Sequence, residues 1–213
     1  MVASDRASLG LLGDDDNSKR RQILDGARKM FMDLGFDGAS MGEIARSAGV
    51  SKGTLYVYFA DKNRLFEAIV EEEALEQGKT AFNFDPARDV TTTLTEFGQA
   101  YLQVLFRPGG GSATRTVMAI AERMPEVGRR FYDNVVSLTI DRLAAYLEAH
   151  VRSGDLAIEE YPLAATQFMQ LCQASLFMPF LFQAAPAPSP ERIAQVVESA
   201  TRMFLATYRA KQG

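Results

Sequence analysis

The sequence predicts an all-α protein, in which an N-terminal three-helix helix-turn-helix domain precedes a larger helical domain. Three observations support this fold class. Apolar residues recur three and four positions apart along most of the 213-residue chain, which is the period of an α-helix. Clusters of glycine and proline separate the periodic segments, and no segment shows the strict alternation of a β-strand. Hydrophobic residues make up 47% of the chain, which is typical of a folded globular protein.

The N-terminus is expected to begin with a flexible tail over residues 1–17, which carries an acidic run at 14–16. The first helix is predicted over 18–34, because apolar side chains recur at helical spacing and Gly35 follows as a helix-ending residue. The apolar positions that should form its buried face are Ile23, Ala27, Phe31 and Leu34.

The segment 40–62 predicts two short helices joined by a tight turn. Ser40 and Glu43 are spaced as a capping box, so a helix should begin at Met41. Gly49 follows the last residues of this helix and is suited to the left-handed conformation that ends one. The inner face of this helix is supplied by Ile44, Ala45 and Ala48.

A second short helix is predicted from its cap at Ser51 to about Phe59. Leu55 and Phe59 lie four residues apart and supply its inner face. The remaining side chains are cationic, amphipathic or hydrogen-bonding, which suits a helix that enters a DNA major groove. Two helices at a steep angle also occur in many small helical domains, so the shape alone leaves a purely structural role open. The outer residues are Ser51, Lys52, Gly53, Thr54, Tyr56 and Tyr58.

Charge is distributed unevenly along the chain. The net charge is −4, which by itself is unfavourable for a nucleic-acid-binding protein. Residues 18–64 nevertheless carry nine basic and five acidic side chains, whereas residues from 65 onward carry 13 basic and 18 acidic ones. The positive excess is therefore concentrated in the predicted helix-turn-helix domain, although an excess of this size also occurs on ordinary solvated surfaces.

Four motifs occur in order between residues 22 and 66. The first helix ends in LGF, the second opens with Ser-x-x-Glu-Ile-Ala, the third carries GVSKGTLYVYF, and a fourth opens with KNRLF. Together they closely resemble the tetracycline-repressor (TetR) family of bacterial transcription regulators. The resemblance implies a repressor that binds a palindromic DNA operator as a homodimer and is released by a small, largely apolar effector.

The resemblance also implies which residues face DNA. Lys52 and Thr54 are the candidates for base-edge contacts, and the tyrosine hydroxyls and Lys62 are candidates for phosphate contacts. The alternative for Tyr56 and Tyr58 is that one of them seals the small core. Val57 is not assigned to the site, because its methyl groups suit either a thymine methyl or simple packing. The expected DNA-facing residues are Ser40, Ser51, Lys52, Gly53, Thr54, Tyr56, Tyr58 and Lys62.

A fourth helix is predicted over 61–80, so it begins in the DNA-binding domain (18–65) and continues into the regulatory domain (66–213). In the family, such a helix is thought to couple ligand binding to the separation of two recognition helices. The rest of the regulatory domain is expected to contain further helices, separated by breaks such as Pro108-Gly-Gly-Gly and a proline-rich linker. Their expected ranges are 89–106, 112–123, 126–152, 162–183 and 190–209.

The last two predicted helices are apolar over much of their circumference. Two such helices from each protomer are expected to form a four-helix dimer interface, and the alternative is that these side chains belong only to the protomer core. Candidate interface residues are Phe168, Leu171, Phe180, Val197 and Phe204.

Aromatic and methionine residues of the regulatory domain suggest an apolar effector cavity, although such residues are more often plain core. Candidate lining residues, with two polar ones that would orient a ligand, are Phe97, Tyr101, Leu105, Met118, Glu122, Phe131, Gln173 and Phe177.

Catalysis and cofactor binding find little support in the sequence. The chain has one histidine, His150, and one cysteine, Cys172, which do not form a nucleophile pair or a metal-ligand set. We therefore expect neither an enzyme nor a metal or cofactor site. The lone cysteine, the absence of a signal-peptide pattern and the shortness of the longest apolar run predict a soluble, cytoplasmic protein. A helical carrier protein for a small apolar molecule, with a degenerate DNA-binding module, is the alternative function.

Overall fold

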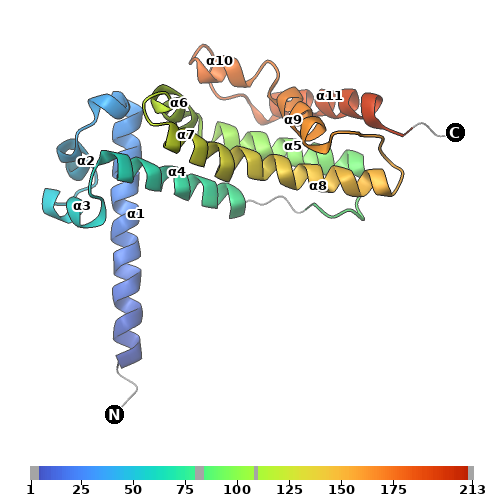
Figure 1. Ribbon diagram of the computed structural model, residues 1–213. Helices are drawn as coiled ribbons and strands as arrows, with labels where there is room; N and C mark the ends of the chain where they lie inside the picture. Colours follow the sequence, from blue (N-terminus) through green and yellow to red (C-terminus); the bar gives the residue numbers. More distant parts are fainter. Residues whose placement is uncertain (1–4, 80–83, 108–109, 211–213) are drawn as a thin grey trace. The chain divides into compact units, whose positions relative to one another are not determined.

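A computed structural model describes residues 5–79, 84–107 and 110–210 of the chain (Figure 1). Within these ranges the chain forms helices and one isolated β-bridge, which confirms the predicted all-α fold. The chain divides into two compact units, the N-terminal unit (Met1–Glu73 with Thr116–Val127) and the C-terminal unit (Ala74–Arg115 with Gly128–Gly213). None of the helices in the described ranges is long and apolar enough to cross a membrane.

The N-terminal unit is built from helices at the start of the chain and from a short later segment. The later segment contains the end of one helix and the beginning of the next. The helices that contribute to this unit are α1 (Asp5–Gly38), α2 (Met41–Ser47), α3 (Lys52–Tyr58), α4 (Lys62–Lys79), α6 (Gly110–Ile120) and α7 (Pro125–Phe131).

The first helix begins earlier than the sequence pattern predicts. α1 begins at Asp5, whereas a flexible tail is expected up to residue 17. The periodic apolar positions begin only at Ile23, so the earlier turns give no signal of a buried face. Regular helical geometry is interrupted at Gly35, whose φ of 71° is easily adopted by glycine.

The core of the N-terminal unit differs from the predicted one at the end of α1. Leu34 is 48% exposed, although its spacing places it on the buried face. Because Gly35 breaks the helix at this point, Phe36 packs there instead, with ring centroids 5.5 Å from those of both Phe31 and Phe66. The fully buried large side chains of this core include Phe66, Ile23, Leu24, Ile44, Leu55, Leu65 and Ile120.

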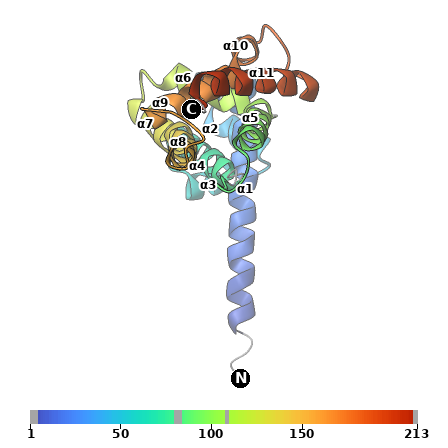
Figure 2. The same cartoon turned by 90° about the vertical axis from the view of Figure 1, so that its right-hand side faces the viewer.

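The C-terminal unit is an assembly of helices in which α9 packs against α5, α8 and α11 (Figures 1 and 2). The predicted helix over 126–152 consists of α7, a π-helical segment and α8, and the predicted helix over 162–183 is divided. The division occurs at Ser175, whose positive φ of 62° is rare outside glycine. The elements are α5 (Val90–Phe106), η1 (Tyr132–Ser137), α8 (Leu138–Arg152), α9 (Tyr161–Gln173), α10 (Phe177–Leu181) and α11 (Pro190–Tyr208).

Helices α5, α9 and α11 approach one another closely at Gly98. A methyl group at this position would lie 2.8 Å from Val197 Cγ1 and 3.0 Å from Cys172 Sγ. Aromatic rings extend the core on both sides of this point, including Phe97 and Phe168 with centroids 6.2 Å apart. The three helices therefore form one packed core rather than separate hairpins.

The end of α11 is attached to the connection between α8 and α9. Ala157 donates its backbone N–H to the carbonyl of Tyr208 at 2.8 Å, and Ala210 donates to the carbonyl of Asp155 at 3.1 Å. Leu156 and Arg209 form the isolated antiparallel bridge between these bonds. We call this arrangement the C-terminal clasp.

Candidate nucleic-acid interface

The capping box predicted at Ser40 is present. Ser40 donates its backbone N–H to Glu43 Oε2 at 3.0 Å, and Glu43 donates its own N–H to Ser40 Oγ at 3.3 Å. The Ser40 hydroxyl also donates to Glu43 Oε2 at 2.6 Å, and these bonds hold the pKa of the Glu43 carboxyl below its ordinary value. The helix begins at Met41, as predicted.

The turn between α2 and α3 is fixed by its own backbone and by α1. Gly49 has a φ of 64°, and Val50 donates to the carbonyl of Ala45 at 2.9 Å. From α1, Gln22 Nε2 donates to the carbonyl of Ala48 at 2.6 Å. A methyl group on Gly26 would lie only 2.6 Å from Ala48 Cβ and 2.7 Å from its backbone nitrogen. Glycine at position 26 therefore allows α1 to pack directly against the end of α2.

The orientation of α3 separates an inner face from an outer face. Leu55 and Phe59 are buried, as predicted. At the N-terminus, Ser51 Oγ accepts from the Thr54 N–H at 2.9 Å and lies 2.7 Å from the Thr54 hydroxyl oxygen. We call the exposed side the α3 outer face, and it consists of Lys52, Gly53, Tyr56 and Val57, which share one side of the helix.

Val57 is the residue of this face that sequence reasoning did not assign. Val57 is 82% exposed, which is the highest value among the large hydrophobic residues in the described part of the chain. Tyr56 beside it is 49% exposed. A valine with this exposure is largely uncovered by the described part of the chain. The helical period places Val57 next to Lys52 and Tyr56. The sequence alone does not tell whether its methyl groups contact a thymine methyl or pack within the protein.

Lys62 has a structural role that the sequence did not indicate. Its ammonium group donates to the carbonyl oxygens of Phe36 at 2.5 Å, Ala39 at 3.0 Å and Asp37 at 3.3 Å. The same nitrogen lies 4.6 Å from the centroid of the Phe36 ring. An ammonium group has three protons, so these carbonyls engage its full donor capacity. Lys62 thus connects the start of α4 to the end of α1, and a phosphate would have to replace one of these partners.

Tyr58 is half-buried, and its hydroxyl is also engaged within the N-terminal unit. It donates to Asp16 Oδ1 at 2.5 Å. Ser40, Ser51, Thr54 and Tyr58 are therefore placed by hydrogen bonds within the protein, while Lys52 and Tyr56 present exposed side chains.

Among the described residues, ion pairs connect α1 to later parts of the N-terminal unit. Arg28 pairs with Asp25 at 3.0 Å and with Glu72 of α4 at 2.7 Å, and all three side chains are at least partly accessible. Near the end of α1, Asp37 pairs with Arg123 at 2.7 Å, and the guanidinium group holds the pKa of this carboxyl below its ordinary value. The segment that precedes α7 is thus held to the end of α1.

The predicted effector residues are divided between the two units. Met118, which is 61% exposed, and Glu122, which is also exposed, belong to the N-terminal unit. In the C-terminal unit, Gln173 Nε2 donates to the Tyr101 hydroxyl at 2.5 Å, and burial raises the pKa of this tyrosine to about 12. Phe97 is buried and stacks on Tyr101 with ring centroids 5.9 Å apart. The remaining predicted residues, each half-buried, are Leu105, Phe131 and Phe177.

The predicted dimer residues are not equally accessible in the protomer. Phe168 and Val197 are fully buried and Phe204 is 1% exposed, because α9 and α11 direct these side chains into the protomer core. Leu171 and Phe180 are half-buried. Periodicity shows that a helix has a wide apolar surface but does not tell which part of it a partner would cover.

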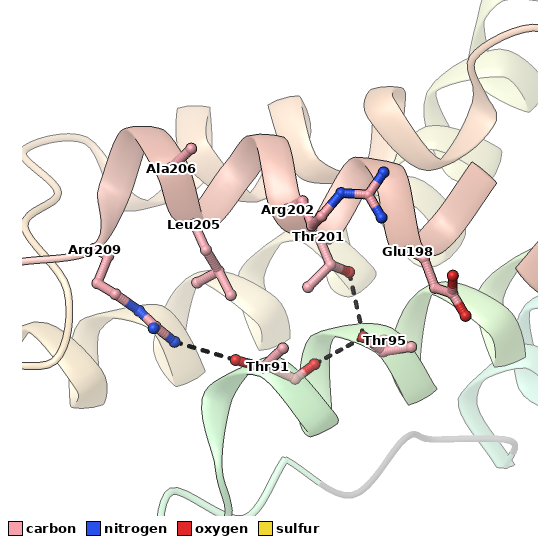
Figure 3. Close-up of a pocket in the computed structure, with 8 residues that line it drawn as sticks. All are labelled: Thr91, Thr95, Glu198, Thr201, Arg202, Leu205, Ala206 and Arg209. Atoms are coloured by element: carbon pink, nitrogen blue, oxygen red, sulfur yellow. Dashed lines mark hydrogen bonds between the residues drawn. The ribbon is translucent and has the colours of Figure 1, made fainter. Parts of the chain in front are cut away.

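Two grooves are present along α11. The first, of about 560 Å³, lies between α9 and α11, and Leu171, Phe204 and Met203 are among its lining residues. The second, of about 700 Å³, lies between α5 and α11 (Figure 3). In it, Arg209 donates to the Thr91 hydroxyl at 3.2 Å and Thr95 donates to Thr201 Oγ1 at 3.4 Å. Neither groove is lined by the predicted effector residues.

The buried cysteine is chemically protected. Cys172 is fully buried, and burial raises the pKa of its thiol to about 12. The reactive thiolate is therefore suppressed at neutral pH. In the described part of the chain, no group of histidine, cysteine and acidic side chains is arranged to hold a metal ion.

Comparisons with known proteins agree with this geometry. Residues 23–69 match the family model of bacterial regulatory proteins of the tetR family, and residues 92–210 match that of the AefR-like transcriptional repressor C-terminal domain. A protein from Mesorhizobium loti assigned to the TetR-family regulators has a similar structure, with a TM-score of 0.80 and 26% identity over 91% of this chain and 98% of that one. The flavonoid-responsive regulator FrrA has a TM-score of 0.75 and 27% identity over 92% and 100% of the two chains.

Sequence relatives match only part of the chain. The transcriptional repressor AcnR of Corynebacterium efficiens is 35% identical over 68 residues, which cover 32% of this chain and 36% of AcnR. This chain matches about a third of the length of AcnR and of two similar repressors. The family models together extend over both units, and the C-terminal model alone matches more than half of the chain. The chain therefore belongs to the TetR family of bacterial transcription regulators.

Proposed function

We propose that this protein is a DNA-binding transcriptional repressor that acts as a homodimer on a palindromic operator and is released by a small, largely apolar effector. The observation that carries the proposal is the α3 outer face. Lys52, Tyr56 and Val57 stand exposed on a helix whose other side is fixed by the buried Leu55 and Phe59. A short, rigid helix with such an outer surface is the element that reads bases in a helix-turn-helix protein.

The side chains of the α3 outer face suit different parts of a DNA duplex. Lys52 is suited to guanine acceptors and Val57 to the methyl group of thymine, while Gly53 permits close approach of the backbone. Tyr56 and Tyr58 carry hydroxyls that suit phosphate oxygens, as do Ser40 and Ser51. Thr54 is suited to either a base or a phosphate. Lys62 contributes to binding mainly by fixing α4 to α1, and contacts phosphate only if it exchanges a carbonyl partner.

Dimerisation is supported by the groove between α9 and α11. Leu163 and Met203 on these helices are 48% and 56% exposed, and Leu171 lies in the groove between them. We infer that the equivalent surface of a second copy covers this face and completes a four-helix interface. Two α3 helices related by a twofold axis would then read two half-sites of a palindrome. A protein that binds chromosomal DNA in this way acts in the cytoplasm.

The effector is inferred to bind within the C-terminal unit near Phe97, Tyr101 and Gln173. The aromatic rings favour an apolar or aromatic molecule, and the hydrogen-bonded Tyr101–Gln173 pair offers polar groups that would orient it. The similarity to a regulator that responds to flavonoids supports the same chemical class. To shift the DNA-binding population from 99:1 to 1:99, an effector must prefer the released conformation by about 5.5 kcal/mol.

The experiment that tests the proposal is fluorescence anisotropy of the protein with DNA from immediately upstream of its coding region. A scrambled fragment of the same length and composition serves as competitor, across a salt series. We expect strong preference for the upstream fragment, two protomers or a multiple of two per site, and a steep loss of affinity with salt.

A matched pair of double variants distinguishes the α3 outer face from general surface effects. Lys52→Ala combined with Tyr56→Ala should abolish the preference. Lys29→Ala combined with Tyr132→Ala removes the same residue types from exposed positions elsewhere and should preserve it. Equal and weak binding of both DNA fragments by the wild type would favour a remote operator or the carrier function, and genome-wide selection of bound fragments would then decide.

A further inference from the structure

The part of α1 around Asp16 and Arg20 contacts the C-terminal end of α3. The Tyr58 hydroxyl donates to Asp16 Oδ1 at 2.5 Å. One turn further along α1, the guanidinium carbon of Arg20 lies 5.7 Å from the centroid of the Phe59 ring. Asp16 and Arg20 are four residues apart and therefore share one side of α1. This side runs next to the residues that end α3.

The contact brings a carboxylate to a hydroxyl that is proposed to bind DNA. A tyrosine hydroxyl has a single proton to donate. The acceptor that DNA offers to Tyr58 is a phosphate oxygen, which is anionic like the carboxylate of Asp16. The two acceptors therefore compete for one proton. They also repel each other, because a phosphate bound to Tyr58 would lie close to the Asp16 carboxylate.

Asp16 is a negative charge next to a segment with a positive excess. Residues 18–64 carry the positive excess of the chain, whereas Asp16 ends a run of three aspartates that is separated from them only by Asn17. An acidic run alone indicates no more than a solvated surface. The hydrogen bond to Tyr58 is what links this particular carboxylate to the DNA-facing helix.

We infer that Asp16 is an affinity-setting residue, which occupies Tyr58 in the free protein and opposes its contact with the DNA backbone. The inference rests on the proposed function in DNA binding. The Asp16 carboxylate then acts as an internal competitor of phosphate. Binding requires the Asp16–Tyr58 bond to open, so the protein binds DNA less tightly than its α3 outer face alone would allow.

The test is a double-mutant cycle in the full chain, with Asp16→Asn, Tyr58→Phe and the combined variant, measured by anisotropy on the upstream fragment. The amide of asparagine accepts a weaker hydrogen bond and carries no charge. Asp16→Asn should therefore tighten binding about fivefold to tenfold at low salt. The gain should shrink as salt increases, because screening removes the repulsive part. In the Tyr58→Phe background the same substitution should have little effect.

The control is Asp33→Asn, which makes the same change in an exposed carboxylate of α1, roughly 25 Å further along the helix axis. It should leave the affinity nearly unchanged. An equal gain from this control, or a gain that persists in full without the Tyr58 hydroxyl, would assign the effect to general charge and overturn the inference. Unchanged affinity of Asp16→Asn would also overturn it. If the wild type binds upstream and scrambled DNA equally, the cycle is measured on a fragment recovered by genome-wide selection; if no fragment is recovered, the proposed function fails and the inference fails with it.

Discussion

The ammonium group of Lys62 joins two helices of the N-terminal unit through atoms that lie far apart in sequence. Its three carbonyl partners belong to residues 36–39, at the end of α1. A helix end leaves carbonyl groups without intrahelical partners, and a cation placed there satisfies them and interacts favourably with the helix dipole. Lys62 therefore adds to the Arg28–Glu72 ion pair and the packing of Phe66 in fixing α4 against α1.

The variant Lys62→Met tests this structural role. Methionine keeps much of the length and apolar character of the side chain but leaves the three carbonyls without their charged donor. We expect the free energy of unfolding to fall by about 1–3 kcal/mol, measured by urea denaturation. Lys52→Met is the control, because the exposed Lys52 side chain should contribute less than about 0.5 kcal/mol. Unchanged stability together with weaker DNA binding would show that Lys62 is mainly a phosphate contact.

At the scale of helices, the packing of α1 against α2 depends on the absence of a side chain at Gly26. The nearest atoms are those of Ala48, including its backbone nitrogen, which cannot move without displacing the end of α2. In contrast, Gly53 lies on the exposed side of α3. A methyl group there would lie 3.7 Å from Ser51 Oγ, which is an ordinary van der Waals contact.

The substitutions Gly26→Ala and Gly53→Ala should therefore change stability in opposite directions. Overpacking at position 26 should lower the free energy of unfolding by about 1–3 kcal/mol, partly offset by the better helix propensity of alanine. At position 53 the propensity gain acts alone and should raise it by up to about 1 kcal/mol. Thermal and urea denaturation of both variants provide the measurement. A stabilising Gly26→Ala would show that α1 and α2 tolerate a wider separation.

The parts of the fold that follow from local chemistry were the parts that the sequence predicted well. The caps at Ser40 and Ser51 and the turn at Gly49 involve neighbours in the chain, so spacing alone identifies them. The contacts of Lys62 and Tyr58 connect residues more than 20 positions apart, and no local pattern indicates them.

Side-chain orientation was the second feature that the sequence left undetermined. Phe168 and Leu171 lie on one apolar helix, yet the first is fully buried and the second borders a groove. Val57 is apolar and exposed, contrary to the usual behaviour of valine. Which side of an apolar helix faces the core is decided by its neighbours in space, and these are not known until the chain is folded.

At the scale of the whole molecule, the exposed part of the groove between α9 and α11 is the surface on which the proposed dimer depends. Met203 is 56% exposed and lines this groove, so a polar substitution there should leave the protomer fold intact. Met178 on α10 has the same exposed fraction and does not line the groove, which makes it a matched control.

Met203→Arg should convert the dimer to a monomer. An arginine without a partner in a buried interface is costly, and we expect the dimer dissociation constant to rise by at least about 100-fold. Sedimentation velocity measures this constant, and operator affinity should fall in parallel. Met178→Arg should sediment as the wild type. If both variants remain dimeric, a different surface joins the protomers; if both dissociate, the effect does not depend on the groove.

The C-terminal clasp also has a consequence for how the opening of the C-terminal unit is observed. Its two backbone hydrogen bonds join residues 155–157 to residues 208–210, so the N–H groups of Ala157 and Ala210 remain paired only while α11 is in place. Amide hydrogen exchange at these positions depends on the opening of a contact between distant segments rather than on fraying of one helix. These two amides therefore act as built-in reporters of α11 docking, and neither residue lines the grooves along that helix.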